Sequence, residues 1–278
     1  MAATKDDQIS MVGEFGNRTV PEMLIGCWHR KSIVFRDGKV DTATKVIWLQ
    51  TASGVADIRI PGDRRDLSAK TLDECSPDDL LALAEQDCFA AVTLFDSATT
   101  PLPTAIWPPE LDILRFQPAV MFPEDGWLEW RDNGLTMIEF APSGAYEEDW
   151  RLREKPDFAF HLKRLDVDCV EEIFIAGNEA IRARGKAVSA RSAHDGGANT
   201  LLDLGRDDPS HLRALVDCEF SYARRSQATG HYQIELSTLP WLEQSRLDVE
   251  WAMRDGDPSA VLQDSSGSRW RILSLWRR

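Results

Sequence analysis

The chain has 278 residues, of which 43% are hydrophobic, and its formal net charge is −14 at pH 7. This charge opposes attraction to a phosphate backbone or an anionic membrane surface, so we expect no nucleic acid and no membrane as partners. No apolar run approaches the ~20 residues that cross a bilayer. The first twenty residues also lack the apolar core of a signal peptide, so we expect a cytoplasmic protein. Five cysteines, odd in number and without a CxxC pair, favour reduced and mostly buried thiols over a disulfide or zinc framework.

Short extended runs separated by turn residues dominate the chain. Asp37-Gly38 follows the run CWHRKSIVF, and Asn133-Gly134 separates WLEWR from LTMIEF. Such pairs are typical of tight hairpin turns. Gly177-Asn178 separates EEIFIA from EAIRAR, and DSSG separates AVLQ from SRWRILSLW near the end of the chain. The pattern predicts an all-β protein with a few short helices.

Two predicted helix starts resemble each other. Residues 76–83 read SPDDLLAL and residues 208–215 read DPSHLRAL. Both have an N-cap residue followed by a proline at the first helical position. Trp150-Arg151-Leu152 and Trp270-Arg271-Ile272 correspond in the same way. A unit of about 130 residues repeated twice explains both matches, because a period of this length indicates a duplicated domain and not a solenoid.

The duplication predicts two β domains of similar design. Each would contain many short strands, and closure of such a sheet into a barrel removes its exposed edges. We expect an N-terminal tail at 1–20, a first β-barrel domain with the ligand site at 21–155, and a second β-barrel domain at 156–278.

Gly26-Cys27-Trp28, at the start of the first extended run, resembles the G-x-W motif of lipocalins. In lipocalins the tryptophan closes one end of the barrel against an arginine from a late strand, and the resemblance implies Arg151 or Arg153 for that role. WHRKSI, VIWLQ, ADIRIP and the run from Tyr146 to Trp150 together resemble an uncharacterised family of paired lipocalin-like barrels, distantly similar to a yeast casein-kinase-interacting double-barrel protein. The resemblance covers most of residues 24–155. It implies two tandem lipocalin-like antiparallel β-barrels and no established reaction.

The stretch VIWLQTASGVADIRIP, residues 46–61, alternates apolar with polar or aromatic side chains. Trp48 and Gln50 share one face of the first run, and Asp57 and Arg59 share one face of the second. The turn leaves open whether these two faces coincide. The opposite faces are too apolar to be left in water, and they consist of Ile47, Leu49, Ile58 and Ile60. We therefore expect the polar set inside the first barrel, with a surface ion pair between Asp57 and Arg59 as the alternative.

The run that contains Trp28 extends this predicted interior. With Trp28 inside, alternation places Arg30 and Ser32 inside as well. The same alternation points outward the side chains of Cys27, His29, Ile33 and Phe35.

The run AYEEDWRL supplies a second group of candidates. If Trp150 lies inside, Tyr146 and Glu148 share its face. Glu139, on the preceding run, lies on a mostly apolar face, where burial raises the pKa of a carboxyl and suits it to acid–base chemistry near neutrality. The alternative is a solvated strand, because residues 147–149 are three consecutive acids.

Together these residues form the predicted site in the first barrel. The catalytic candidates are Glu139, Tyr146, Glu148 and Asp57, and the ligand-binding candidates are Arg30, Trp48, Gln50, Arg59, Trp130 and Trp150. The chain has no HExxH, GxSxG, GxxxxGK[ST] or GxGxxG motif. We therefore expect no metal, no cofactor and no Ser-His-Asp hydrolysis.

Three functions remain open, because barrel folds support all of them. The first is binding of an apolar or aromatic small molecule in the first barrel. The second is a cofactor-independent lyase, isomerase or hydratase that uses the candidate acids and Tyr146 for proton transfer, with Arg59 or Arg30 holding an anionic group. The third is a non-catalytic protein-interaction module with both barrels filled. A homodimer also remains open.

Overall fold

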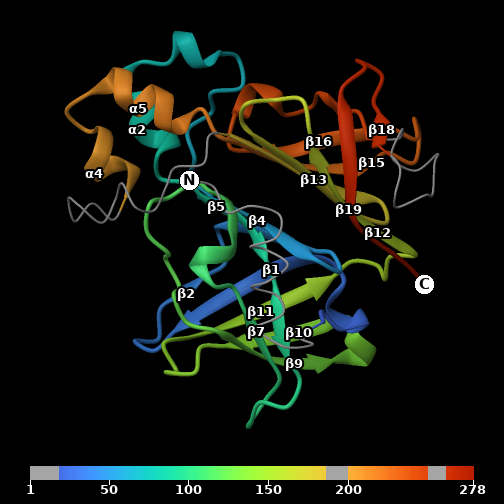
Figure 1. The fold of residues 1–278 in the computed structure, drawn as a ribbon. Coiled ribbons are helices and arrows are strands. Elements are labelled where there is room, and N and C mark those ends of the chain that lie inside the picture. Colours follow the sequence, from blue (N-terminus) through green and yellow to red (C-terminus); the bar gives the residue numbers. More distant parts are fainter. Residues whose placement is uncertain (1–18, 186–199, 250–260) are drawn as a thin grey trace.

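The computed structural model describes residues 19–185, 200–249 and 261–278. Two antiparallel sheets of 11 and 8 strands form its framework, and each curls into a half-barrel (Figure 1). The expected all-β fold is confirmed, as two antiparallel sheets that follow one another along the chain and curl in the manner of barrels.

The first sheet has the order β6-β7-β9-β10-β11-β1-β3-β4-β5-β8, with β2 paired to β1. All the predicted hairpin turns of this region are present. Its strands are β1 (Gly26–Phe35), β2 (Val40–Asp41), β3 (Lys45–Gln50), β4 (Gly54–Ile60), β5 (Asp87–Val92), β6 (Leu94–Asp96), β7 (Thr104–Ile106), β8 (Asp112–Arg115), β9 (Gly126–Arg131), β10 (Thr136–Phe140) and β11 (Tyr146–Leu152).

The second sheet has the order β17-β16-β15-β14-β13-β12-β19-β18. The hairpins predicted at residues 177–178 and 264–267 join β13 to β14 and β18 to β19. Its strands are β12 (Phe158–Arg164), β13 (Val170–Ala176), β14 (Glu179–Gly185), β15 (Glu219–Arg225), β16 (Tyr232–Ser237), β17 (Arg246–Leu247), β18 (Val261–Gln263) and β19 (Arg269–Arg277).

Both predicted helices are present and capped as expected. Ser76 caps α2 (Pro77–Leu83) by accepting from the backbone N–H of Asp79, and Asp208 caps α5 (Pro209–Val216). These two helices pack together beside α4 (Leu201–Gly205), at one end of the molecule (Figure 1). None of the helices in the described ranges has the length and apolarity of a membrane span. Short 3-10 turns occur at Glu22–Leu24, Leu72–Glu74, Pro109–Leu111, Asp132–Gly134 and Pro240–Leu242.

The same connectivity recurs in the two sheets. In the first, β11 pairs with β1, and β3, β4, β5 and β8 follow on the other side of β1. In the second, β19 pairs with β12, and β13, β14, β15 and β16 follow in the same way. The helices α2 and α5 each precede the corresponding strand, β5 or β15. This common order is what a duplicated unit produces, and it supports the repeat inferred from the two helix starts.

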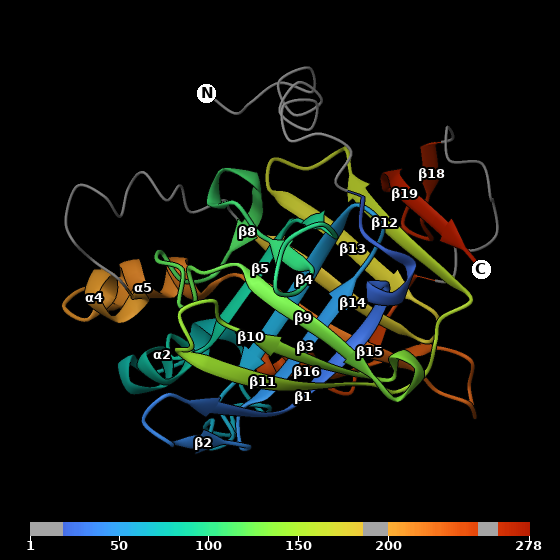
Figure 2. The ribbon, with the colours of Figure 1, turned by 90° about the horizontal axis from the view of Figure 1, so that it is seen from below.

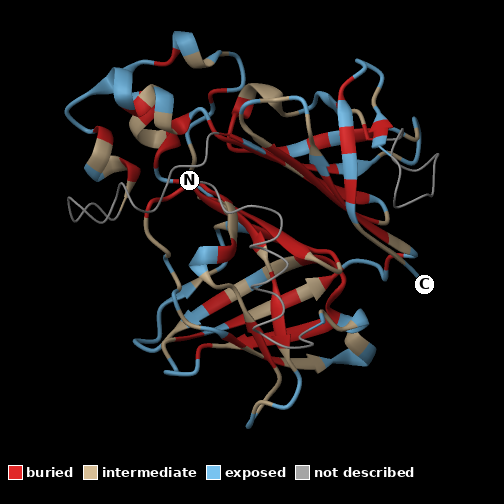
Figure 3. Ribbon diagram, viewed as in Figure 1, coloured by how far each residue is buried: buried red, intermediate tan, exposed pale blue. Residues whose placement is uncertain are grey.

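One hydrophobic core lies between the sheets. The apolar faces of β3 and β4 pack there against Phe174, Ile181 and Phe220 of the second sheet. Figure 2 shows the strands of one sheet lying across those of the other, and Figure 3 shows the buried residues concentrated along this contact. The prediction that the outer faces of these strands pack against the second unit is therefore confirmed. The four apolar residues on these faces are at most 6% exposed: Ile47, Leu49, Ile58 and Ile60.

A β-bulge in β1 reverses the side of the sheet to which the side chains beyond it were predicted to point. The register of β1 against β11 shifts between Arg30 and Ser32. A bulge adds one residue to its strand and therefore inverts the alternation beyond it. Ile33 is consequently buried against Tyr146 on the inner side, with Phe35 packed beside it. The predictions that Ser32 faces inward and that Ile33 and Phe35 face outward are wrong for this reason.

The cysteines within the described residues are free thiols, as predicted. Cys169 is partly buried and the other four are buried.

Candidate functional site

A cavity of about 60 Å³ lies on the inner face of the first sheet. Its walls are aromatic and its polar groups are mostly acidic; they include Trp48, Trp107, Trp150, Phe122, Asp57, Arg59, Asp87, Glu139 and Tyr146. A cavity of about 150 Å³ accommodates benzene, so this space admits the head group of a ligand but not a whole aromatic ring.

The registers of β3 and β4 settle which residues share the cavity face. Trp48 lies directly opposite Asp57, and Val46 lies opposite Arg59. Directly opposed residues of two strands point to the same side of a sheet. The polar faces of the two strands therefore coincide, and the Asp57 side chain is 3% exposed. The interior position predicted for these residues is confirmed, and the surface ion pair is excluded.

Asp57 and Arg59 form a buried ion pair at the cavity. Arg59 Nε lies 2.6 Å from Asp57 Oδ1, and Arg59 Nη2 lies 3.5 Å from Oδ2. The guanidinium also stands over the Phe122 ring, 5.1 Å from its centroid. Arg59 Nη1 is buried and has no hydrogen-bond partner among the described residues. One strong donor at the cavity is thus unused by the protein.

Asp87, which the sequence analysis did not select, lies beside this donor. It is opposite Arg59 in the register of β4 and β5, and it is 5% exposed. Burial raises the pKa of its carboxyl, while the charge of Arg59 opposes the rise. Asp87 Oδ1 has no hydrogen-bond partner within the described ranges. Both side chains line the cavity, so an unused acceptor and an unused donor belong to the same wall.

Glu139 is the acid with the most altered titration at the cavity. Its carboxyl accepts from Trp150 Nε1 at 3.1 Å and from the Tyr146 hydroxyl at 3.4 Å. Burial, followed by the charge of Glu148, raises the pKa of Glu139 to about 8. Burial and then the charge of Glu139 also raise the pKa of Tyr146. Glu139 is therefore largely protonated at neutral pH, and Tyr146 is a neutral phenol.

Arg30 and Glu148 neutralise each other away from the cavity wall. Arg30 Nη1 lies 2.7 Å from Glu148 Oε1, and Arg30 Nη2 lies 2.9 Å from Asp41 Oδ2. The side chains of Arg30 and Glu148 are 4% and 2% exposed. The two side chains thus have each other as buried hydrogen-bond partners. This geometry indicates a structural role for Arg30 and Glu148 and gives no support to a ligand contact.

Gln50 is likewise occupied by the protein. Its amide nitrogen donates to the carbonyls of Thr51 and Gly54, and its amide oxygen accepts from Trp48 Nε1 at 3.1 Å and from Thr93 Oγ1 at 3.0 Å. Gln50 thus orients the Trp48 indole and has no group left for a ligand.

The tryptophans divide between the cavity and the packing around it. Trp48 makes edge-to-face contacts with Trp150 and with Trp107, at centroid distances of 5.4 and 5.2 Å. All three line the cavity. Trp130 instead packs against Phe95, with centroids 6.1 Å apart, and is not part of the wall. Trp107 was missed because the short strand β7 precedes it and gave no clear alternation.

The arginine implied for the G-x-W motif is not in contact with Trp28. The Trp28 indole donates to the Leu24 carbonyl at 2.9 Å. Arg151 is opposite His29, so it lies on the other face of the sheet and pairs with Asp149. The expectation for Arg151 is therefore wrong. Arg153 likewise has its nearest acid in the second sheet, 3.9 Å away at Glu179.

A Ser–His–Glu series links the two sheets and was also missed. Ser53 Oγ lies 2.8 Å from His161 Nδ1, and His161 Nε2 lies 2.7 Å from Glu172 Oε2. This is the connectivity of a hydrolytic triad. However, Ser53 Oγ donates to Ser274 Oγ at 2.8 Å and does not line the cavity described above. We assign the series to packing between the sheets.

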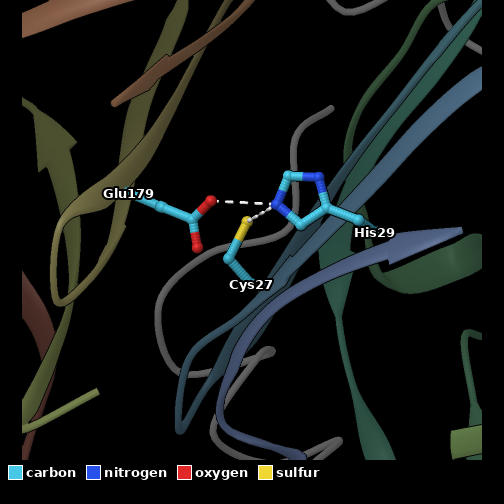
Figure 4. Close-up of side chains that lie close together, drawn as sticks. All are labelled: Cys27, His29 and Glu179. Atoms are coloured by element: carbon cyan, nitrogen blue, oxygen red, sulfur yellow. Dashed lines mark hydrogen bonds and ion pairs between the residues drawn. The ribbon is translucent and has the colours of Figure 1, made fainter. Parts of the chain in front are cut away.

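The other face of β1 holds side chains that could bind a metal ion. Within the described part of the chain, Cys27, His29 and Glu179 place their ligand atoms within 4.8 Å of one another (Figure 4). Motif spacing missed this group because Glu179 is 150 residues from His29 in the sequence.

Comparison with known proteins supports the fold and no more. No family model and no curated protein matches the chain. Among solved structures, it is similar to the crystal structure of YLR301w, an uncharacterized protein from Saccharomyces cerevisiae. The TM-score is 0.54 and the identity is 12%, over 90% of this chain and 98% of that chain. The distant resemblance to a yeast protein is supported to this extent.

Proposed function

We propose that the first sheet binds a small uncharged molecule through Arg59 and Asp87. The supporting observation is that two residues opposite each other on the cavity wall each have an unused group, the donor Arg59 Nη1 and the acceptor Asp87 Oδ1. A buried polar group without a partner costs about 1–3 kcal/mol. A ligand group that both donates and accepts, such as an amide or a hydroxyl, would satisfy both atoms at once.

The charge of the lining favours a neutral head group over an anion. Asp57 already pairs with Arg59, and Asp112 binds Arg115 through two hydrogen bonds of 2.7 and 2.8 Å. Every guanidinium on the wall therefore has a carboxylate partner. A bound anion would face Asp87 without a free cation to offset the repulsion. The arginines are thus poorly suited to the anionic group considered from the sequence.

The aromatic walls favour an apolar or aromatic body for the ligand. Trp107 and Phe122 line the cavity, as does the rest of the segment 120–125. Because about 60 Å³ holds only a head group, a ring would have to lie against this segment and displace Met121, which is 56% exposed. Aromatic amides and phenols combine this shape with the required polar group.

One observation favours a second candidate function, a cofactor-independent lyase, isomerase or hydratase at the same cavity. Glu139 has a pKa of about 8 and accepts a hydrogen bond from Tyr146. A carboxyl with such a pKa can donate or accept a proton near neutrality. In this reaction Glu139 would be the general acid or base, and Tyr146 would orient it.

A four-ligand panel tests the binding proposal. Benzamide, phenol, benzoate and benzylamine share one ring and differ in the head group. Tryptophan fluorescence should report binding, because Trp48, Trp107 and Trp150 line the cavity. We expect saturable quenching by benzamide and phenol and little response to benzoate.

Asp87→Ala should weaken benzamide binding about 10- to 100-fold, the worth of a hydrogen bond to a charged group. Glu129→Ala is the matched control, because the Glu129 side chain on β9 is 40% exposed and pairs with Arg131. Tightest binding by benzoate, or unchanged benzamide binding by Asp87→Ala, would contradict the proposal.

A further inference from the structure

Three potential metal ligands from the two sheets converge at one point. Cys27 Sγ lies 3.8 Å from His29 Nε2, which in turn lies 2.9 Å from Glu179 Oε1. Figure 4 shows the thiol and the carboxylate directed at the same ring nitrogen. Ligand atoms around a tetrahedral Zn²⁺ are roughly 3.3–3.6 Å apart, given bond lengths of about 2.0–2.3 Å. The two distances to His29 Nε2 match this spacing to within about half an ångström, and all three ligand atoms lie within 4.8 Å of one another.

The backbone explains why these side chains meet. Cys27 and His29 are two residues apart on β1 and precede its bulge, so they share the face opposite Trp28. Glu179 is the first residue of β14 and follows the turn at Gly177, whose φ of +56° suits glycine. The turn of the second sheet thereby brings a carboxylate to the first strand of the first sheet.

We propose that Cys27, His29 and Glu179 bind a divalent transition metal ion, with Zn²⁺ as the reference ion. Thiolate, imidazole and carboxylate are the ligands that zinc takes in proteins, and three protein ligands leave a fourth position for water. A dication with one thiolate and one carboxylate has no net charge, which suits a buried position.

Metal binding displaces the hydrogens that lie between the three side chains. In the ion-free protein, the Cys27 thiol and the neutral His29 ring each carry one hydrogen, and the His29 Nε2 hydrogen points at Glu179 Oε1. As the metal–sulfur bond forms, the Cys27 S–H bond breaks and its proton passes to solvent. The Nε2 hydrogen of His29 also passes to solvent while Nδ1 takes up a proton, so the ring stays neutral and coordinates through Nε2. The metal thus bonds to all three groups, and one proton is released overall.

The surroundings orient the ligands and admit the ion. The Tyr222 hydroxyl donates to Glu179 Oε1 at 2.6 Å, which fixes the carboxylate as outer-sphere partners of metal ligands do. The His29 side chain is 19% exposed and lines a surface pocket of about 270 Å³ with Tyr222. Arg153 Nη1 is 3.9 Å from Glu179 Oε1, beyond hydrogen-bond distance, so it leaves the carboxylate accessible.

Cobalt provides a spectroscopic test on the full chain. The protein is treated with a chelator, dialysed and titrated with Co²⁺, whose bond to a thiolate gives a charge-transfer band in the near ultraviolet. We expect one Co²⁺ per chain with this band, and displacement of cobalt by Zn²⁺. Zn²⁺ should also raise the Tm by several degrees, because an ion that binds only the folded chain stabilises it.

Single substitutions test whether these three side chains are the metal ligands. Cys27→Ser should abolish the band, and Glu179→Gln should weaken Co²⁺ binding at least tenfold. His29→Asn provides a second ligand variant if Cys27→Ser fails to fold, as judged by circular dichroism. Cys169→Ser is the matched control, because Cys169 is also a free thiol but is only partly buried, and it should bind as the unaltered protein does.

Two results would overturn the proposal. One is the absence of stoichiometric binding by the unaltered chain. The other is a band that persists in Cys27→Ser or disappears in Cys169→Ser. Neither result bears on the ligand panel, because the cavity lies on the opposite face of β1.

Discussion

Glu139 shows how a single buried residue couples the fold to pH. Its carboxyl has an ordinary pKa of 4.5, and the folded protein raises this value to about 8. Between these two pH values the folded chain retains a proton that the unfolded chain has lost. The contribution of Glu139 to stability is therefore complete below pH 4.5 and declines as the pH rises to about 8.

Replacement of this acid tests the coupling. We expect the free energy of unfolding, measured in urea, to fall by a few kcal/mol between about pH 5 and about pH 8. Glu139→Gln should remove most of this decline, because glutamine does not titrate and has the same shape: its amide oxygen can accept from Trp150 Nε1, and its amide nitrogen can donate to the Tyr146 hydroxyl oxygen. An equal decline in the variant would show that other groups cause it.

Two histidines join the sheets at corresponding elements. His29, on the first strand β1, meets Glu179 at the turn between β13 and β14. His161, on the first strand β12, meets Ser53 in the turn between β3 and β4. In each case the first strand of one sheet contacts the same hairpin of the other. The two units therefore share the order of their strands, and they also use corresponding strands and hairpins to contact each other.

Replacement of His161 tests whether its contact stabilises the packing of the two sheets. His161→Ala should lower the free energy of unfolding by about 2–4 kcal/mol, because it leaves the buried Glu172 without its closest partner. His211→Ala is the control, since His211 is exposed on α5, and it should change stability by less than about 0.5 kcal/mol. Equal losses in the two variants would contradict a structural role for His161.

The sequence predicts those elements that depend on local chemistry. Helix caps, hairpin turns and the alternation around Trp48 follow from neighbouring residues, and the structure confirms them. The bulge in β1 could not be predicted, because one extra residue in a strand has no local signature. The positions of Asp87 and Glu179 depend on which strands are neighbours and on their register. That information arises only when distant segments pair.

In the whole molecule, the two sheets share one hydrophobic core between them, and each also has a smaller hydrophobic cluster of its own. Residues of both sheets form the largest hydrophobic cluster, and the connection between the sheets is short and largely exposed at residues 153–157. Two units with separate strands but a common core should unfold together. They should also stay associated when the connection is cut.

Limited proteolysis tests this arrangement and the proposed boundary near residue 155. A glutamate-specific protease should cut at Glu154, which is exposed. The two fragments should then elute together in size-exclusion chromatography without denaturant. Separation of folded fragments would contradict a shared core, and the absence of any cut would argue against an accessible boundary.

Ligand binding through the free groups of Arg59 and Asp87 can be seen directly in a crystal structure of the protein with saturating benzamide. We expect the amide between Arg59 Nη1 and Asp87 Oδ1, with Met121 displaced by the ring. A structure in which Arg59 and Asp87 bond directly to each other, and benzamide is absent from the cavity, would contradict it.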